Sequence, residues 1–460
     1  MTGDRFDVVV VGSGVSGSSA AATAAAAGLR VAVVEKLAEP GGSAALSAGM
    51  FWTAPDLESL RARIPLGDPA RGRRLVEDYR SALADVRATG IRVADDPQTD
   101  IMTFGIGYSL DIRALLAHCR DRVVAAGGEI LLSSPVTAVA PDGDGWVVET
   151  ATAGGPRRLS AGAVVLASGG FQGDPELLAR YVGRNADRLL LRSNPGSVGD
   201  GLRLARGNGA GGTGAMSTFY GHLIAWPLQR WTTEDFLPYS QYYSESTVLL
   251  NLAGERFVDE TLGDEILNQD LTFQRDGLGV LVLDEHVRST EAVSEPFPGL
   301  GEVDRLELAR QAGARVATAD TLDELVELIG EWGIDPVAAR RSLETYVDAV
   351  RDGRRSSEGV PVGATARAPQ DPPFHAVMVQ PSITFTFGGI PTDDAGRVLD
   401  RDRHEVPGLF AAGADIGGLS NYGYAGGIAP GYITGRWAGE SAARYARSAA
   451  STPEPTGVQS

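Results

Sequence analysis

The sequence is poor in the residues that build cross-links and metal sites. Of its 460 residues one is a cysteine, Cys119, which excludes disulfide frameworks, clusters with several cysteine ligands and haem attachment through C-x-x-C-H. The five histidines are scattered without the short spacing of metal ligands, so we expect no metal site. No apolar run approaches the roughly 18 residues of a membrane span, and no export signal pattern precedes the first expected strand. We expect no membrane span and a cytoplasmic location.

Positive charge is scarce as well. Lys36 is the only lysine, and the formal net charge is −18. Such a chain is repelled by phosphate backbones and anionic membrane surfaces, so nucleic acid and membrane are not expected partners. With 43% hydrophobic and 22% charged residues the composition is that of a globular protein, and the length exceeds one typical core.

The segment from Phe6 to Lys36 carries the clearest pattern, FDVVVVGSGVSGSSAAATAAAAGLRVAVVEK. A run of valines predicts a buried parallel strand, and three glycines follow in G-x-G-x-x-G spacing. Gly12 allows the tight turn, Gly14 lets a pyrophosphate approach the backbone, and Gly17 lets the helix pack closely. Glu35 follows the second strand, where an acid can bind a ribose 2′-OH. The segment predicts dinucleotide binding without distinguishing NAD from FAD.

Segments of small residues recur further along the chain. Gly41 to Gly49 suggests backbone lying against a large flat ligand, and the strands ending near Gly170 and Asp415 place small residues at the carboxyl edge of a sheet. A second G-x-G-x-x-G match at residues 207–212 follows a helix rather than a strand, so it predicts no second nucleotide fold.

The texture of the sequence changes twice, which predicts two domains. Aromatic residues cluster from Thr218 onward, and a Pro/Gly/Ser-rich stretch ends at Pro373. We expect a dinucleotide-binding domain over residues 1–217 and 374–447, an inserted domain over 218–373, and a disordered tail over 448–460.

Four segments together resemble flavoproteins of the fumarate reductase and 3-ketosteroid dehydrogenase group. They are VVVVGSGVSG…VVEK, GGSAALSAGM, VVLASGGF with GDGLRLA, and ITFTFGGI…GLFAAGADIGG…YAGGIAPGYITGRWAG, which span residue 6 to about residue 443. The resemblance implies an α/β fold, in which a Rossmann-like, glutathione-reductase-like FAD-binding domain is interrupted by an α+β capping domain. It also implies FAD rather than NAD.

Carried over position by position, the resemblance implies a set of FAD contacts. Members of the group with a covalent flavin have a histidine where Ser43 stands here, so non-covalent FAD follows. The start of the last helix would present N–H groups to the flavin. The implied contacts are Gly12, Gly14, Ser16, Gly17, Glu35, Lys36, Gly42, Ser43, Ala44, Ala48, Gly49, Val136, Ala167, Asp200, Gly413, Asp415, Ala429 and Pro430.

Two departures from the fumarate reductases bear on the substrate. Those enzymes have a His-His pair where Thr384-Phe385 stands here, and an arginine where Tyr424 stands. Bidentate arginine is the natural partner of a carboxylate, and neither phenylalanine nor tyrosine can replace it. The resemblance therefore disfavours fumarate reduction.

Ketosteroid dehydrogenases place a tyrosine in a segment of similar shape, and Tyr424 before Gly426-Gly427 resembles it, although the glycine spacing differs by one residue. Desaturation beside a carbonyl removes an α-proton, which becomes acidic only when hydrogen bonds stabilise the developing enolate. We assign that role to the Tyr424 hydroxyl and the Gly427 N–H.

The base is left open among Tyr108, Tyr242 and Tyr243, since plain packing explains each of them as well. The expected substrate contacts are Phe385, His222 and Tyr422, and a structural, hydrogen-bonded role for His222 is an equal reading.

The expected function is FAD-dependent α,β-desaturation of a cyclic ketone or 3-ketosteroid-like substrate, by an enzyme acting on CH–CH donors (EC 1.3), with the substrate enclosed between the two domains. One alternative is a fumarate-reductase-like enoate reductase on a small carboxylate, and another is a flavin-binding electron-transfer protein. The electron acceptor is unidentified, although the lack of a second nucleotide fold disfavours direct use of NAD(P)H.

Overall fold

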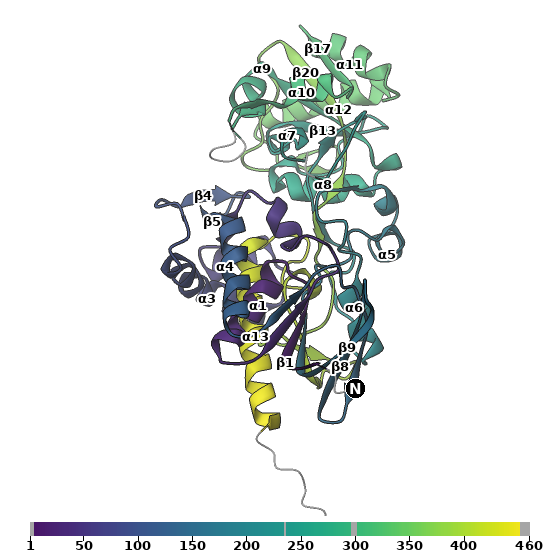
Figure 1. The fold of residues 1–460 in the computed structure, drawn as a ribbon. Helices are drawn as coiled ribbons and strands as arrows, with labels where there is room; N and C mark the ends of the chain where they lie inside the picture. Colours follow the sequence, from purple (N-terminus) through teal and green to yellow (C-terminus); the bar gives the residue numbers. More distant parts are fainter. Residues whose placement is uncertain (1–3, 234–235, 296–300, 451–460) are drawn as a thin grey trace, which may run out of the picture. The chain divides into compact units, whose positions relative to one another are not determined.

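The computed structural model describes residues 4–233, 236–295 and 301–450, and the chain forms two compact units (Figure 1). Unit 1 comprises Met1–Asp174, Asn194–Thr218 and Phe385–Ser460, and unit 2 comprises Pro175–Ser193 and Phe219–Thr384. Each unit has its own sheet and its own buried apolar clusters.

The centre of unit 1 is a parallel sheet in the order β24-β9-β1-β2-β6, with β23 antiparallel at the β24 edge. Valines fill it, and Val8 pairs with Val31 on one side and with Ala163 on the other. Its strands are β1 (Asp4–Val11), β2 (Val31–Val34), β6 (Glu129–Leu131), β9 (Gly155–Leu166), β23 (Arg397–Leu399) and β24 (Glu405–Ala411). The carboxyl ends of β1, β9 and β24 meet at one edge, where ligands bind in open α/β sheets.

Two antiparallel additions complete the strands of unit 1. β7 (Val136–Asp142) and β8 (Gly145–Thr152) form the hairpin expected around Asp142–Gly145, and β8 pairs with β9. A separate sheet has the order β3-β5-β4, from β3 (Met50–Thr53), β4 (Gln98–Ile101) and β5 (Gly105–Ser109).

Helices α1 (Val15–Ala26) and α13 (Ile428–Ala450) pack closely, because small residues line both. A Cβ on Gly439 would lie 2.5 Å from the Ala20 carbonyl oxygen. The expected tail from residue 448 is wrong for its first three residues, which continue α13, and residues 451–460 lie outside the described residues. The remaining helices of unit 1 include α2 (Leu57–Arg63), α3 (Pro69–Ala88), α4 (Ile112–Ala125) and α6 (Asp200–Gly207).

Unit 2 is an antiparallel sheet in the order β12-β20-β14-β13, with β17 also paired to β20. Helices α11 and α12 contribute to the apolar cluster on this sheet. The α/β fold with an α+β second unit is thus confirmed. Elements of unit 2 used below are α8 (Asp264–Thr272), α10 (Arg305–Gln311), α11 (Leu322–Gly330), α12 (Pro336–Arg351), β11 (Phe219–Tyr220), β12 (Ile224–Ala225), β13 (Val248–Asn251), β14 (Gly279–Asp284), β17 (Val316–Ala319) and β20 (Phe374–Gln380).

The boundaries of the units differ from those expected at two places. Residues 374–384 were expected in the dinucleotide-binding domain, but β20 is the strand that joins β12, β14 and β17 in the unit 2 sheet. Pro175–Ser193 also falls in unit 2, where Leu190 and Leu191 pair with Ser382 and Ile383. Both segments owe their place to pairing partners far away in the sequence.

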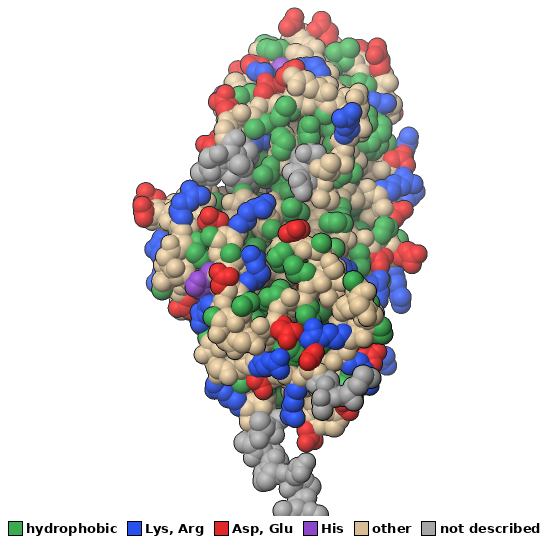
Figure 2. Space-filling view, in the orientation of Figure 1, with side chains coloured by type: hydrophobic (Ala, Val, Ile, Leu, Met, Phe, Trp, Pro, Cys, Tyr) green, Lys and Arg blue, Asp and Glu red, His purple; other side chains and the backbone are tan. Residues whose placement is uncertain are grey.

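Within the described ranges, no helix is both long and apolar enough to cross a membrane. On the face drawn in Figure 2, acidic and basic side chains are interspersed, without one dominant basic field.

Candidate active site

Glu35 ties together the loops at the carboxyl edge of the unit 1 sheet. One carboxylate oxygen accepts from the Ser13 N–H (2.9 Å) and the Ser13 hydroxyl (2.8 Å), and the other accepts from the Leu37 N–H (2.9 Å). The Ser13 hydroxyl in turn accepts from the Gly41 N–H (3.2 Å). Glu35 therefore fixes the glycine turn and the Gly41 loop together, besides any contact with a ribose.

The N-terminus of α1 has the features of a phosphate cradle. Gly14 caps it in an extended conformation, no side chain caps the helix, and its first turn holds no acid. A Cβ on Gly14 would meet nothing closer than the Gly41 carbonyl oxygen at 4.0 Å, whereas Cβ atoms on Gly12 and Gly17 would clash with backbone. Open space over Gly14 and unpaired helix N–H groups fit the pyrophosphate of FAD.

Asp415 lies where β24 and β9 end. Its carboxylate accepts from the Ser168 N–H, the Ser168 hydroxyl (3.1 Å) and the Gly170 N–H (3.2 Å), and it is 1% exposed. Burial raises its pKa, against the lowering by these donors. Beside it, Lys36 pairs with Asp200 (2.6 Å). Asp415 and Asp200, two of the three acids expected at the FAD site, thus already have partners within the protein.

The other expected cofactor positions in unit 1 lie after β9, in and after the Gly42–Leu46 helix, and at the start of β7. Ala167 leaves the end of β9, its N–H donating to Val11 (2.9 Å), and the Ser43 hydroxyl accepts from the Asn194 N–H (3.2 Å). Gly49 packs its backbone against Leu110, which explains that glycine without a ligand. Gly42 and Ala44 lie in the short 3-10 helix Gly42–Leu46, Ala48 follows it, and Val136 opens β7.

The start of α13 forms the second part of the cradle. The Gly413 N–H donates to Thr434 (3.0 Å), and a Cβ on Gly413 would clash with Ser16. Ala429 and Pro430 lie in the first turn of α13, which contains no acid. The helix start is thus electropositive and suited to negative charge on a bound group.

Tyr424 is surrounded by aromatic rings of unit 1. Its ring stands edge-on to Trp52 (centroids 5.2 Å apart) and to Phe385 (5.6 Å), and stacks on Phe387 (6.4 Å). It is 6% exposed. Tyr422, two residues earlier, is partly buried with a φ of 65°. The structure therefore brings together two of the predicted residues, Tyr424 and Phe385, in surroundings that are apolar rather than cationic.

The Tyr424 hydroxyl also lies beside Gly427. A Cβ on Gly427 would stand 2.9 Å from the hydroxyl oxygen and 3.8 Å from Cε1 of Phe385. The Gly427 carbonyl accepts the first bond of α13 from the Gly431 N–H (2.9 Å), so Gly427 caps the helix. Because the first N–H groups of a helix have no partner inside it, a hydroxyl and helix N–H groups converge here.

Tyr108 faces away from this cluster. It pairs with Phe51 across β5 and β3, and opposite residues point to the same face. Phe51 stacks on Tyr79 (5.7 Å), while the next residue, Trp52, points to the other face and meets Tyr424. The Arg87 guanidinium lies 4.6 Å from the Tyr108 ring. The β3-β5-β4 sheet thus separates Tyr108 from Tyr424.

In unit 2, His222 lies in a network that the sequence did not reveal. Its Nε2 is 2.6 Å from the Tyr220 hydroxyl, and its Nδ1 contacts the Asp264 carboxylate. Its ring stands edge-on to Tyr242 (4.7 Å). Asp264 carried no signal, because it lies 42 residues from His222 in the chain, and Tyr220 was one of several clustered aromatic residues.

The two candidate bases of unit 2 differ in their surroundings. Tyr243 is 3% exposed, and its hydroxyl donates to Gln241 (2.6 Å). Burial strongly raises its pKa. The Tyr242 hydroxyl accepts from Arg192 (3.3 Å); burial raises the pKa of Tyr242, and Arg192 opposes that rise. The Tyr243 hydroxyl thus donates within the protein while the Tyr242 hydroxyl accepts, and the choice of base stays a prediction.

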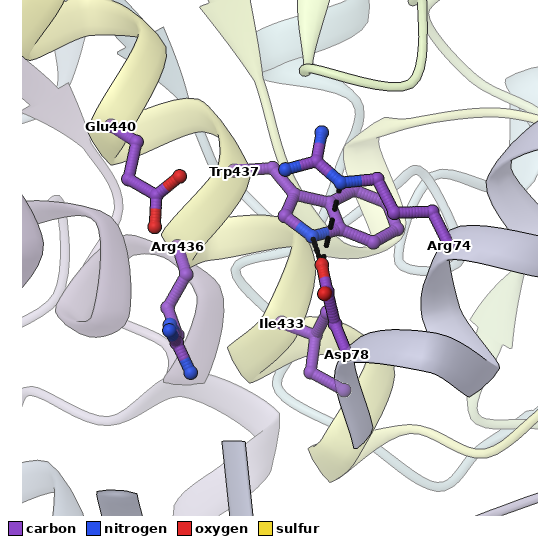
Figure 3. A pocket seen from close by; sticks show the side chains of 6 residues that line it. All are labelled: Arg74, Asp78, Ile433, Arg436, Trp437 and Glu440. Carbon is purple, nitrogen blue, oxygen red and sulfur yellow. Dashed lines mark hydrogen bonds and ion pairs between the residues drawn. The ribbon is translucent and has the colours of Figure 1, made fainter. Parts of the chain in front are cut away.

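A pocket of about 110 Å³ between α3 and α13 is distinct from these features (Figure 3). The Trp437 indole donates to Asp78 (2.7 Å), and the Arg74 guanidinium lies 4.6 Å from the Trp437 ring. Arg436 pairs with Asp85 (2.7 Å). These contacts fasten α3 to α13. The lining residues, none of them predicted for the site, are Arg74, Asp78, Ile433, Arg436, Trp437 and Glu440.

Comparison with known proteins identifies the family of the chain. Residues 104–429 match the family described as FAD binding domain, and residues 7–174 match the one described as FAD dependent oxidoreductase. The chain is 27% identical to a fumarate reductase (cytochrome) of Shewanella frigidimarina, over 96% of this chain and 78% of that protein. It is 25% identical to the 3-oxosteroid 1-dehydrogenase of Mycolicibacterium smegmatis, over 90% of this chain and 92% of that protein.

The fold has close counterparts among solved structures. A 3-ketosteroid delta1-dehydrogenase from Sterolibacterium denitrificans, in complex with 1,4-androstadiene-3,17-dione, gives a TM-score of 0.74 at 18% identity, covering 96% of this chain and all of that chain. The sequence-based assignment of FAD is confirmed by the family match. The chain belongs to the FAD-binding-domain family and is an FAD-dependent oxidoreductase related to both fumarate reductases and 3-ketosteroid dehydrogenases.

Proposed function

We propose that the chain catalyses α,β-desaturation of a cyclic ketone or 3-ketosteroid-like substrate, as an enzyme acting on a CH–CH bond (EC 1.3). The observation that carries this proposal is the Tyr424 hydroxyl held beside Gly427 in an aromatic surround. The relatives are named fumarate reductase and 3-oxosteroid 1-dehydrogenase, and both names describe interconversion of CH–CH and C=C bonds.

The Tyr424 hydroxyl and the Gly427 N–H polarise the substrate carbonyl. As the α-proton leaves, negative charge grows on the carbonyl oxygen, and two preorganised donors in a buried setting stabilise that charge. Both donors are neutral, so the site without substrate carries no charge that would need a counter-ion. Trp52, Phe385 and Phe387 surround the tyrosine with apolar surface, which favours an apolar ring over a small dicarboxylate.

The FAD is held non-covalently at the carboxyl edge of the sheet by the glycine cradle, Glu35, Asp415 and the start of α13. Ser43 has no nucleophilic nitrogen that could attach the flavin, whereas the covalent members have a histidine at this position. When bound, FAD supplies the two-electron oxidant for the β-hydrogen and its electron pair. The electron acceptor that completes the cycle is a quinone, a dye-like acceptor or oxygen. The cytoplasmic location of the protein stays a prediction.

The test is anaerobic bleaching of the flavin in the purified holoenzyme. A panel of cyclohexanones and 3-ketosteroids bleaches the flavin if the proposal is correct, and the matching enone accumulates in equal amount. If only dithionite bleaches the flavin and fumarate-like acids then reoxidise it, the chain is an enoate reductase instead. If neither class reacts, the electron-transfer alternative stands.

A further inference from the structure

Ser13 lies between Gly12 and Gly14 of the glycine turn and binds Glu35 through two donors. Its N–H (2.9 Å) and its hydroxyl (2.8 Å) both donate to Oε2 of Glu35, and the residue is 1% exposed. Gly14 borders the open space at the start of α1, so Glu35 is held beside the group that this phosphate cradle binds. Ser13 was not among the FAD contacts expected from the sequence.

The direction of each hydrogen bond around Ser13 is fixed. An ionised carboxylate only accepts, so the Ser13 hydroxyl donates its single proton to Glu35. The Ser13 hydroxyl oxygen is left as an acceptor, and the Gly41 N–H donates to it (3.2 Å). The Ser13 carbonyl accepts from the Ser18 hydroxyl (3.0 Å). Every polar group of Ser13 thus has a partner, and the residue joins the glycine turn, the end of β2 and the loop at Gly41.

These bonds leave the two carboxylate oxygens of Glu35 unequal. An ionised carboxylate offers about four lone-pair positions, two on each oxygen. Ser13 occupies both positions on Oε2, whereas Oε1 accepts from the Leu37 N–H (2.9 Å). Within the ranges that the structure describes, the Glu35 side chain has no other hydrogen-bond partner, and the residue is 8% exposed. One acceptor position therefore remains, and it is on Oε1.

Glu35 is also a buried anion that neutral donors hold. None of the ion pairs among the described residues includes Glu35, and Lys36, the next residue, pairs with Asp200 (2.6 Å). The Glu35 backbone is fixed as well, since its N–H donates to the Leu131 carbonyl and its carbonyl accepts from the Ser134 N–H, both at 2.8 Å. A buried carboxylate is costly to desolvate unless donors surround it. The protein supplies three donors, and a hydroxyl of a bound ligand would supply the fourth.

We propose that Ser13 is a positioning residue that restricts Glu35 to a single ribose hydroxyl of FAD. An acid at this place in a dinucleotide-binding fold binds ribose. The adenosine ribose offers two neighbouring hydroxyls, at C2′ and C3′, and a carboxylate with both oxygens free could accept from both. Because Ser13 occupies Oε2, the contact is made through Oε1 with one hydroxyl. The role of Ser13 concerns the cofactor and does not depend on the substrate.

The experiment titrates the full-length apoprotein with FAD and with its 2′-deoxyadenosine and 3′-deoxyadenosine analogues, and follows flavin fluorescence. In the wild type one analogue is expected to bind about tenfold more weakly than FAD, as for the loss of one hydrogen bond to a charged group, and the other as tightly as FAD. Equal weakening by both analogues would show that Glu35 accepts from both hydroxyls, and no weakening by either would show that it accepts from neither. Either result overturns the proposal.

Ser13→Ala separates positioning of Glu35 from plain support of the fold. The variant is expected to bind FAD about tenfold more weakly, and the affinity ratio between FAD and the sensitive analogue is expected to fall towards one, because Glu35 is no longer held in place. A structural role alone would weaken FAD and both analogues by the same factor, so an unchanged ratio overturns the proposal. Ser19→Ala is the matched control and should keep the wild-type ratio, since its hydroxyl is similarly buried on α1 but donates to the Tyr432 carbonyl (2.7 Å).

Hydrogen exchange in the apoprotein gives a readout that needs no cofactor. Ser13→Ala removes the acceptor of the Gly41 N–H, so peptides that contain Gly41 are expected to exchange faster than in the wild type. Ser19→Ala is expected to leave that exchange unchanged. Wild-type exchange at Gly41 in Ser13→Ala would overturn the link between the turn and the loop. The comparison of analogues on the wild type requires no variant, so it decides the single contact even if Ser13→Ala does not fold.

Discussion

The hydroxyl oxygen of Tyr424 lies 2.9 Å from the point where a Cβ would stand on Gly427. The two residues are three positions apart, so the close approach comes from the turn at Gly426, which takes a φ of 102° before α13 begins. Aromatic rings hold the tyrosine from the other sides. The Tyr424 hydroxyl and the start of α13 beside it therefore form one preorganised arrangement.

Gly427→Ala tests whether this close approach matters for the reaction. The new methyl group would force the Tyr424 hydroxyl aside, so we expect flavin reduction by ketones to fall by roughly 10²-fold, as for other ångström-scale displacements. FAD binding is expected to persist. Gly207→Ala is the control, because a Cβ there meets nothing within 4 Å. Wild-type turnover of Gly427→Ala would show that the close approach has no role in the reaction.

Tyr424→Phe removes the donor while keeping the ring and its aromatic contacts. Loss of one oxyanion donor costs about 10²–10³ in kcat, and we expect a loss in that range with little change in FAD content. Stopped-flow reduction measures it. Tyr445→Phe, on α13 and packed on Phe410, serves as the control. A near-normal kcat would remove Tyr424 from the reaction.

Local spacing made the glycine turn and the position of Glu35 predictable. The glycines from Gly12 to Gly17 and the acid at Glu35 act through backbone turns that neighbouring residues determine, and the structure has them at the carboxyl edge of the sheet. The resemblance added Tyr424. What spacing could not give was side-chain direction, since Tyr108 points away from Tyr424 because of the register between β5 and β3.

Contacts between distant segments could not be predicted in the same way. His222 was singled out, but its partner Asp264 lies on α8, and only folding brings the two together. The unit boundary was misplaced for a similar reason, because Phe374–Gln380 has the composition of any buried strand. Its membership in unit 2 depends on pairing with β14.

Glu35→Gln is expected to loosen the FAD site. The carboxylate receives three donors on its two oxygens, and an amide can satisfy only one side, leaving donors unpaired at a cost of about 1–3 kcal/mol. We expect the dissociation constant for FAD to rise by about tenfold or more. Fluorescence titration of the apoprotein measures it, with the exposed Glu39→Gln as control. Equal affinities would contradict the role given to Glu35.

Arg256 and Glu260 form a buried ion pair in unit 2. The bonds measure 2.9 Å and 2.5 Å, and the side chains are 3% and 1% exposed. Arg256→Met leaves the buried carboxylate without its counter-charge, so we expect the free energy of unfolding to fall by about 3–5 kcal/mol. Urea denaturation measures it. The double variant Arg256→Met/Glu260→Leu should recover part of the loss, and a double variant no better than the single one would count against the pairing.

Acidification is expected to destabilise the fold through two histidines of unit 2. Burial lowers the pKa of His222 and of His375, the latter against the raising effect of Glu285. Between these lowered values and the ordinary value of 6.5 the unfolded chain binds more protons than the folded one, so the free energy of unfolding rises with pH. The stability that the two neutral histidines contribute is fully present above about pH 6.5 and is lost as the pH falls below it. Denaturation midpoints measured from neutral pH downward test this sign. His375→Gln should flatten part of the slope, whereas a slope equal to that of the wild type would assign the effect to other groups.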